Sequence, residues 1–216
     1  MTERLSRIFN EIPCCGVFAD VACDHGYIAY AMLKSGKCEK AFVSDVSAKS
    51  LLKAEKLLSE YIASGRAQSF VSDGFDNVPK ADTALIAGIG GTLIIDILER
   101  AEKAGKLPDN LVLQPMKHCD KVRYAAVRFG YKILKDFTVS ADGLFYDVIV
   151  LKTGKDVITP EEAEFGRTNI KERPPAFKEK IRVQIGKLLS YAARDNISEN
   201  TRAEMLEKAK DLERYV

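Results

Sequence analysis

The sequence predicts an α/β fold with a mostly parallel sheet, a closing antiparallel hairpin and a small C-terminal helical domain. Three observations predict this fold. Short apolar runs alternate with helical patterns along most of the chain, two strand-like runs then follow one another directly, and two amphipathic helical patterns end the sequence. Alternating strands and helices require a parallel sheet with helices on both faces.

Five apolar runs have the length and composition of buried strands. Between the second and third runs, Leu51, Ala54 and Leu58 share one helix face with Tyr61 and Ile62, which predicts one helix. A second helix is predicted after the fourth run, where Leu93, Ile94, Ile97, Leu98 and Ala101 recur at helical spacing. The five predicted strands are Val17–Val21, Ala41–Asp45, Ala67–Val71, Thr83–Ala87 and Leu111–Gln114.

The sixth and seventh runs differ because no helix separates them. Tyr131–Val139 and Leu144–Leu151 are joined by a short segment that contains Asp142-Gly143, a pair that favours a tight turn. These two runs should therefore form an antiparallel hairpin. Five parallel strands that end in such a hairpin are typical of the Rossmann-like fold of class I methyltransferases, a likeness at the level of the fold.

A domain boundary is predicted after the hairpin. The expected domains are residues 1–154, which hold the sheet, and residues 155–216, an antiparallel helix pair. Thr159-Pro160 and Pro174-Pro175 mark breaks near its start. Thr201 with Glu204 predicts the capping box of the last helix.

Composition limits the classes of function. The 216 residues carry a net charge of only +2, so an attraction for nucleic acid has to come from local clusters. Five cysteines without zinc-ligand spacing, and two histidines, predict reduced thiols and no metal site. Neither a signal segment nor an apolar run of membrane-spanning length is recognisable, so a cytoplasmic monomer or weak dimer without membrane contact is expected.

The segment Asp20–Tyr27 follows the first predicted strand and opens a helix, where a ligand at the carboxyl edge of the sheet makes contact. Small residues at Ala22 and Gly26 let the backbone approach a ligand. Carboxylates at Asp20 and Asp24 disfavour a pyrophosphate and suit the positive charges of S-adenosylmethionine. An ordinary structural turn is the alternative interpretation.

The second and third strands also end in carboxylates. Asp45 can accept hydrogen bonds from ribose hydroxyls, although a helix N-cap shared with Ser47 is the alternative. Asp73-Gly74 can meet an adenine amino group or form a simple turn. After the fourth strand, Ala87-Gly88-Ile89-Gly90-Gly91 allows the backbone to approach two ligands at once, so methyl donor and acceptor are expected to meet there.

Candidate contacts to the acceptor follow the fifth strand and recur near the C-terminus. Gln114 can read a base edge, and Pro115 fixes the loop; a capping Gln is the alternative. Cations after this strand and in the penultimate helical pattern can bind phosphates, with a solvated helix face as the bland alternative. The expected RNA contacts are Gln114, Pro115, Lys117, Arg123, Arg128, Lys178, Lys180 and Arg182.

Together these motifs resemble the bacterial tRNA (adenine-22 N1)-methyltransferase family. Ala19–Tyr27, Ala81–Gly91 and Leu113–Pro115 carry the resemblance, with Phe165-Gly166 and Pro174–Phe177. The sequence departs from the family pattern at four positions: Ala22 replaces Gly, Ala29 replaces Pro, Ile89 replaces Met and Met116 replaces Asn.

The resemblance implies methyl transfer from S-adenosylmethionine to N1 of an adenine in tRNA, with S-adenosylhomocysteine as product. Residues 1–154 are then expected to bind S-adenosylmethionine and carry out catalysis, and residues 155–216 to bind tRNA. The expected catalytic residues are Asp24, Gly88, Gly90 and Gln114. The expected cofactor contacts are Asp20, Ala22, Asp24, His25, Gly26, Asp45, Asp73, Gly74, Ala87, Gly88 and Ile89. A methyltransferase for another RNA or a small molecule, or a non-catalytic module that binds nucleotide or RNA, are the remaining hypotheses.

Overall fold

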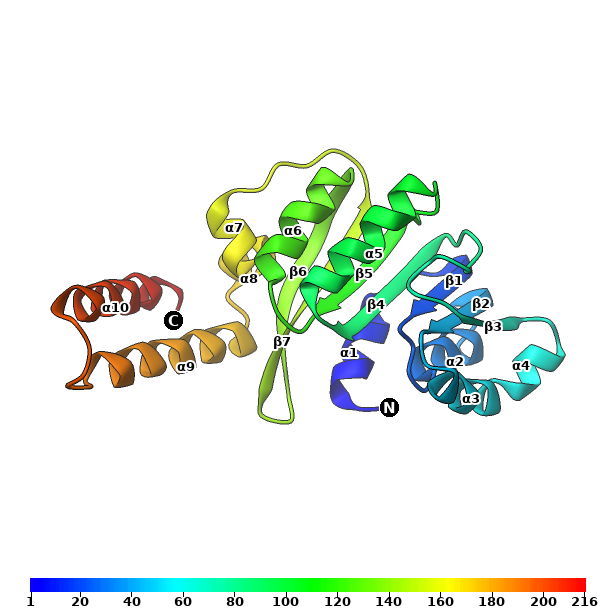
Figure 1. The fold of residues 1–216 in the computed structure, drawn as a ribbon, viewed down its shortest axis with the longest axis horizontal. Coiled ribbons are helices and arrows are strands. Elements are labelled where there is room, and N and C mark those ends of the chain that lie inside the picture. The colour runs from blue at the N-terminus through cyan, green and yellow to red at the C-terminus, as the bar shows by residue number, and fades with distance from the viewer.

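Seven strands form one sheet in the order β3-β2-β1-β4-β5-β7-β6 (Figure 1). The computed structural model describes residues 1–216. The predicted strands all form, most of them longer by a few residues at one or both ends. They are β1 (Cys15–Val21), β2 (Cys38–Asp45), β3 (Ala67–Val71), β4 (Thr83–Ile89), β5 (Asn110–Pro115), β6 (Tyr131–Ala141) and β7 (Leu144–Thr153).

The pairing of the strands confirms the predicted fold. β1 pairs in parallel with β2 and β4, and β7 pairs antiparallel with both β5 and β6. Ala141 faces Leu144, so Asp142-Gly143 alone forms the turn, and both residues have positive φ, 51° and 73°. That conformation suits the twist of a two-residue hairpin loop. The hairpin tip therefore lies at the same edge of the sheet as the carboxyl ends of β1, β2, β4 and β5.

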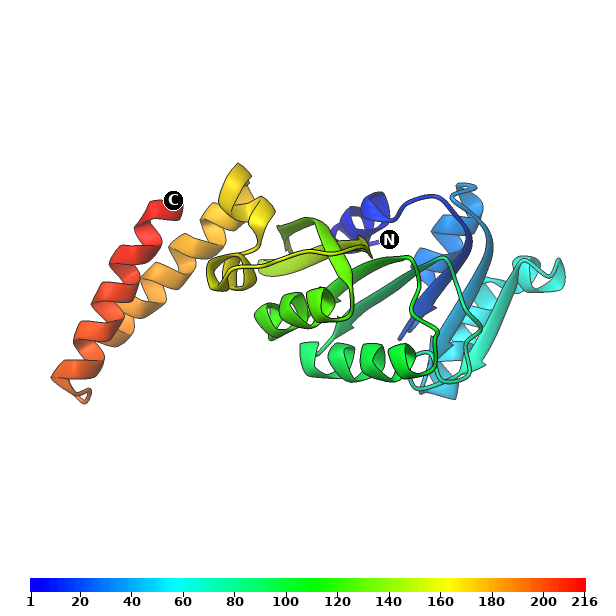
Figure 2. The same ribbon diagram turned by 90° about the horizontal axis from the view of Figure 1, so that it is seen from above.

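Helices cover both faces of the sheet (Figure 2). On one face, α5 (Gly91–Lys103) and α6 (Cys119–Arg128) pack through Ile94, Leu98 and Val122. On the other face, buried side chains such as Ile8, Met32 and Leu51 form a second core. The helices of this second face are α1 (Glu3–Glu11), α2 (Tyr27–Lys34) and α3 (Ala48–Leu57), with the short α4 (Ser59–Ala63) beyond it.

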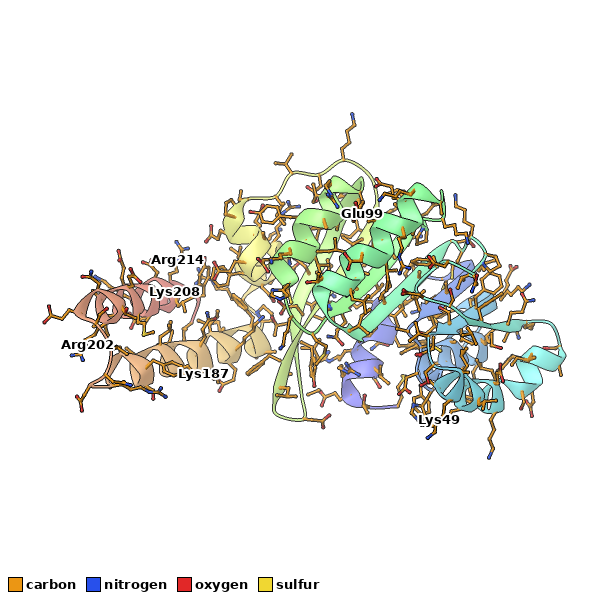
Figure 3. All side chains as sticks on the ribbon, viewed as in Figure 1. Lys49, Glu99, Lys187, Arg202, Lys208 and Arg214 are labelled. Carbon is orange, nitrogen blue, oxygen red and sulfur yellow. The ribbon has the colours of Figure 1, made fainter.

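The segment after the hairpin has two parts. The short helices α7 (Pro160–Phe165) and α8 (Arg167–Glu172) pack against the sheet, where Thr168 and Asn169 hydrogen-bond to β6. The long helices α9 (Pro175–Ala192) and α10 (Glu199–Leu212) then form a hairpin that projects from the sheet, followed by the turn η1 (Glu213–Tyr215) (Figure 2). Lys187 on α9 and Arg202 on α10 lie along this projecting arm (Figure 3).

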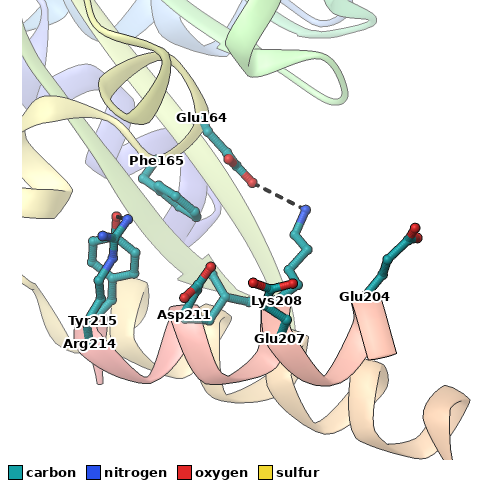
Figure 4. Close-up of a pocket in the computed structure, with 9 residues that line it drawn as sticks. Glu164, Phe165, Glu204, Glu207, Lys208, Asp211, Arg214 and Tyr215 are labelled. Atoms are coloured by element: carbon teal, nitrogen blue, oxygen red, sulfur yellow. Dashed lines mark hydrogen bonds and ion pairs between the residues drawn. The ribbon is translucent and has the colours of Figure 1, made fainter. Parts of the chain in front are cut away.

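A small aromatic core fixes the arm to α7. Phe165 of α7 contacts Phe177 of α9 and Tyr215 of η1, with ring centroids 6.3 and 4.7 Å apart. Lys208 of α10 forms an ion pair with Glu164 of α7 at 3.7 Å, in a shallow pocket between α7 and α10 (Figure 4). The arm is thus held by packing as well as by the chain connection.

The predicted cap of the last helix is wrong by one turn. Ser198, rather than Thr201, is the N-cap residue of α10, and its hydroxyl accepts a hydrogen bond from the Thr201 backbone. The capping box forms instead at α7, where Thr159 and Glu162 exchange hydrogen bonds. No helix in the structure combines the length and the apolar character that crossing a bilayer requires.

Candidate functional site

Two adjoining concavities lie at the carboxyl edge of the sheet, and both are lined by Arg4, Ala22, Asp24 and Ala87. The first adds residues of the β1–α2 turn and of α2. The second extends past the ends of β2, β3 and β4 and has a volume of about 410 Å³. We refer to the two together as the cleft. It gathers all the expected cofactor residues except Gly26.

The β1–α2 turn has an unusual backbone that opens it toward the cleft. Ala22, Asp24 and Gly26 all have positive φ, at 57°, 48° and 69°. The turn is held to β2, because the Cys23 amide donates to the Ser44 carbonyl and the Asp24 amide donates to Asp45 Oδ2 at 3.2 Å. Gly26 is required sterically, since a Cβ there would lie 3.0 Å from Ala54 Cβ. Its role is to let α2 approach α3.

Asp20 ends β1 as a buried carboxyl group that lines the cleft. Its Oδ2 accepts a hydrogen bond from the Ala29 amide of α2 at 3.2 Å. Burial and the neighbouring charge of Asp45 raise the pKa of this carboxyl group to about 7, although the Ala29 hydrogen bond opposes the shift. The cleft therefore contains an acid that a positively charged ligand would help to ionise.

At the cleft opening, Asp24, His25 and Lys53 form a hydrogen-bonded chain. Asp24 Oδ2 lies 2.5 Å from His25 Nδ1, and His25 Nε2 lies 3.2 Å from Lys53 Nζ. Because an ammonium group only donates, Nε2 accepts and Nδ1 carries the proton that is donated to Asp24. The His25 ring also stacks on Tyr27, with an interplanar angle of 3°. This chain fixes the orientation of the Asp24 carboxylate.

Asp45 and Asp73 line the second concavity together with Gly74. Asp45 accepts hydrogen bonds from the amides of Asp24 and Ser47. Ser47 alone is the N-cap residue of α3, so the shared cap that was the alternative for Asp45 is wrong. One oxygen of Asp73 is paired with Arg100 at 2.8 Å. Gly74 has a φ of 62°, and a Cβ there would lie 2.7 Å from Ile97, so no side chain fits.

The end of β4 brings exposed backbone to the cleft. Ala87, Gly88 and Ile89 line it, and Gly88 has a φ of 79° with a register shift against β5. Gly90, expected as a catalytic residue, is the N-cap residue of α5 and lines neither concavity. Gly91 is needed for packing, because a Cβ there would lie 2.4 Å from the Lys117 carbonyl. The glycine run therefore serves both the cleft and the core.

The predicted direct contact of Gln114 and Pro115 with a base needs correction, because both residues are buried. Gln114 Oε1 accepts a hydrogen bond from Arg4 at 2.7 Å, and its Nε2 donates to the Pro115 carbonyl at 3.1 Å. Both ends of the amide are thus occupied. Gln114 supports Arg4 and does not face the cleft.

Three of the predicted phosphate contacts also need correction. Arg123 is completely buried and pairs with Asp136 and Asp147. Arg128 ends α6 at the opposite edge of the sheet. The start of β6 follows it and pairs with the end of β7, which in turn pairs with the start of β5. Lys180 points inward and pairs with the buried Asp147 at 2.7 Å.

The other predicted cations stay exposed or half-buried. Lys117 lies in the loop between β5 and α6. Lys178 and Arg182 line a groove of about 820 Å³ between α1, β6 and α9, and Arg7 and Arg173 also line it. We call this the interdomain groove. Glu3 and Glu179 line it as well, so cations outnumber carboxylates there.

Sequence reasoning missed α1 and the residues that it brings to the cleft. Arg4 is the only lysine or arginine that lines either concavity. Val46 and Leu93 were also missed; they expose apolar side chains in the second concavity, which suit the faces of a flat ring. The helical pattern of residues 3–11 was detectable, but nothing in it placed Arg4 beside β4.

The cleft fits S-adenosylmethionine. Its four aspartates complement a sulfonium and an ammonium group. Asp45 can accept hydrogen bonds from the ribose hydroxyls of the adenosine, and the neighbouring apolar Val46 suits the face of its adenine ring. The exposed backbone of Gly88, with its positive φ, can approach the ligand. A pyrophosphate would meet the carboxylates of Asp24, Asp45 and Asp73 here, which disfavours a dinucleotide.

Comparison with known families settles the class. The family model described as "Methyltransferase domain" matches residues 1–149. The chain belongs to this methyltransferase family. The match covers the complete cleft and extends through the start of β7, so it includes the strand pairing that closes the sheet.

Relatives agree with the resemblance found in the sequence. The tRNA (adenine(22)-N(1))-methyltransferase of Bacillus subtilis is 27% identical over 156 residues, which cover 71% of this chain and 66% of that protein. The chain thus matches just under two thirds of that relative's length. The resemblance to this family is confirmed.

Solved structures show the same fold over the whole chain. A candidate tRNA (m1A22) methyltransferase from Streptococcus pneumoniae superposes with a TM-score of 0.90 at 24% identity, covering 100% of this chain and 99% of that one. Its complex with S-adenosyl-L-methionine superposes with a TM-score of 0.86 at 24% identity, covering 98% and 99%. The C-terminal arm therefore belongs to the shared architecture.

Proposed function

We propose that this methyltransferase transfers the methyl group of S-adenosylmethionine to N1 of the adenine at position 22 of tRNA. The acid-lined cleft carries the proposal, because it suits a positively charged methyl donor. The B. subtilis relative, a tRNA (adenine(22)-N(1))-methyltransferase, supports the choice of acceptor. The interdomain groove supports it as well, because its excess of cations suits a phosphate backbone.

The reaction does not require a general acid or a general base, because N1 of adenine is already unprotonated at neutral pH. S-adenosylmethionine would supply a methyl group on a sulfonium. As the lone pair of the unprotonated adenine N1 forms a bond to this methyl carbon, the bond from carbon to sulfur breaks, so that neutral S-adenosylhomocysteine leaves and the methylated adenine carries the positive charge. The chain then contributes alignment: Asp24 and Asp45 hold the donor, and the backbone of Gly88 lies where donor and base would meet. Holding reactants in line accounts for a large part of such a rate enhancement.

The acceptor base must leave its stack to reach the cleft, which costs a few kcal/mol. Contacts to the tRNA backbone can offset that cost. The interdomain groove is well placed for them, since α1 borders both it and the cleft. Arg7, Lys178 and Arg182 are the cations that we assign to this role.

The direct test is mass spectrometry of nucleosides from a tRNA transcript incubated with the protein and S-adenosylmethionine. We expect 1-methyladenosine in a transcript with adenine at position 22 and none in one with guanine there. Methylation of both transcripts would place the target elsewhere in tRNA. Binding of the donor without methylation of either would indicate a different acceptor.

Asp24 is tested in the same assay. Asp24→Ala should lower kcat/KM by about tenfold or more, because a misaligned donor loses much of the benefit of proximity. Asp120→Ala, an exposed aspartate in the first turn of α6 that lines neither concavity, is the matched control. Full activity of Asp24→Ala would refute the alignment role.

A further inference from the structure

The charges in the cleft are unbalanced in one respect. Asp20, Asp24, Asp45 and Asp73 line it, whereas Arg4 is its only lysine or arginine. These carboxylates suit the sulfonium and ammonium groups of S-adenosylmethionine. They oppose the carboxylate at the end of the same molecule, which needs a cation or backbone amides to be held in this cleft.

Arg4 is held above the end of β4 by contacts on two sides. It lies in the first turn of α1 and donates from Nη1 to Gln114 Oε1 at 2.7 Å. Its guanidinium lies 5.2 Å from the centroid of the Tyr146 ring on β7. Nη1 would be 3.6 Å from a Cβ added to Gly88. The guanidinium is thus positioned before any ligand arrives.

Most of the donors of Arg4 are unused. A guanidinium has five N–H donors. Arg4 makes one side-chain hydrogen bond, to the neutral Gln114, and it pairs with no carboxylate, although four aspartates line the same cleft. A half-buried cation that forms no ion pair in acidic surroundings is available for an anion supplied by a ligand.

The position of Arg4 in the cleft identifies which anion that is. The ribose and adenine ends of the donor belong with Asp45, Val46 and Asp73 in the second concavity. Its amino-acid end then extends past Ala22 into the first concavity, which is formed by the β1–α2 turn and also lined by Arg4. We propose that Arg4 binds the carboxylate of S-adenosylmethionine and that Gln114 positions the guanidinium for this contact.

This inference rests on the proposed cofactor and is independent of which RNA is methylated. It can be tested by calorimetry with S-adenosylmethionine and with its decarboxylated analogue, which lacks only the carboxylate. The wild-type protein should prefer the complete molecule. Arg4→Gln should weaken its binding by about tenfold or more, the effect of losing a charge-assisted hydrogen bond, and should leave binding of the analogue within about twofold.

The ratio of the two affinities is the decisive quantity. Because both ligands are measured on the same protein, partial unfolding of the Arg4→Gln variant cancels from the ratio. Arg128→Gln, at the opposite edge of the sheet, is the matched control and should keep the wild-type ratio. Arg4→Lys should retain part of the preference, because an ammonium keeps the charge without the fork geometry.

Two results would overturn the inference. An equal loss for both ligands would assign Arg4 a purely structural role. Unchanged binding of S-adenosylmethionine, with a raised KM for tRNA, would assign it instead to a phosphate of the acceptor. Failure of the wild-type protein to bind S-adenosylmethionine at all would count against the proposed function and the inference together, whereas binding without tRNA methylation would affect only the choice of acceptor.

Discussion

At the scale of single residues, the β1–α2 turn is shaped by backbone that L-amino acids rarely adopt. Ala22 has a φ of 57°, and its methyl group crowds the backbone in this conformation. Glycine, the residue usual in the family that the sequence resembles, would not suffer this crowding. The departure at Ala22 therefore has a cost in stability that can be measured.

We expect Ala22→Gly to raise the free energy of unfolding by about 1 kcal/mol, because relief of left-handed strain outweighs the added flexibility of the unfolded chain. Urea unfolding without ligand measures this change. The control is Ala29→Gly inside α2, which should be destabilised by about 0.5–1 kcal/mol or more through helix propensity and lost burial. A loss of stability in Ala22→Gly would show that its methyl group packs favourably.

The Asp20 carboxyl group predicts a pH dependence for donor binding. Its pKa of about 7 lies above the usual value because of burial and Asp45. A raised pKa means that Asp20 contributes most to stability at low pH and that this contribution is lost as the pH rises through about 7. A positive ligand favours the ionised form, so binding should release a proton near pH 6 and tighten toward pH 7.5.

Calorimetry in two buffers of different ionisation enthalpy counts the released protons. Asp20→Asn removes the ionisable group, so the proton count near pH 6 should fall in that variant. An unchanged count would mean that another group titrates, and Asp20 would then be a structural partner of Ala29 alone.

At the scale of elements, a buried ion network joins α6 to the hairpin and to the C-terminal segment. Arg123 donates to Asp136 on β6, to Asp147 on β7 and to the Ala163 carbonyl on α7. Burial would raise the pKa of Asp147, but the charges of Lys180 and Arg123 outweigh that effect and lower it. Asp147 therefore adds stability above its ordinary pKa, and this stability is lost as the pH falls through the lowered value.

We expect Arg123→Met to lower the free energy of unfolding by about 3–5 kcal/mol, because it leaves the buried Asp136 without a cation and Asp147 with Lys180 alone. Chemical denaturation measures the change. Arg128→Met, on the same helix but exposed, should change stability by less than about 0.5 kcal/mol. Equal stabilities of the two variants would mean that Lys180 and the hydroxyl of Thr138 suffice for Asp147.

Element positions were predictable where the signal is local. Apolar runs located all seven strands, and Asp142-Gly143 specified the hairpin turn because its positive φ values depend on those two residues alone. The continuous helix predicted over residues 51–62 was not found, because Leu58 leaves the helical conformation with a φ of −95° and a ψ of 9°. The spacing of apolar residues is the same on both sides of Leu58, so periodicity alone cannot reveal a break at one residue.

The residues of the candidate site also fall into a group that the sequence predicts and a group that it does not. The carboxylates at strand ends reach the cleft because topology alone brings the carboxyl ends of parallel strands together. The arginines were not predictable, because their roles depend on packing across the fold: Arg4 lies beside Gln114, 110 positions away, and Arg123 lies in the core. A cation in a sequence shows its charge but not its partners.

At the scale of the whole molecule, the interdomain groove combines parts of both proposed domains. α1 contributes Arg7, β6 contributes residues 137–140, and α9 contributes Lys178 and Arg182. The division expected at 154/155 stays a prediction. Because α7 and α8 pack on the sheet through Arg123 and Thr168, we propose a division near Pro174 instead. Because α9 of the arm lines the groove, removing the arm would destroy the groove. Reversing the charge of exposed groove residues is therefore a better test of tRNA binding than truncation.

We expect the double variant Lys178→Glu with Arg182→Glu to raise the Kd for tRNA by about tenfold at physiological salt. The negative slope of log affinity against log salt should become shallower by about 1.5. The reason is the loss of two phosphate contacts. The matched control reverses the same number of charges at Lys103 and Lys155, which line none of the described concavities and are exposed. Donor affinity should be unchanged in both proteins, since neither pair lines the cleft. Equal tRNA affinity in the two double variants would show that total charge, and not the groove, governs tRNA binding, and the tRNA would then have to approach the cleft from another side.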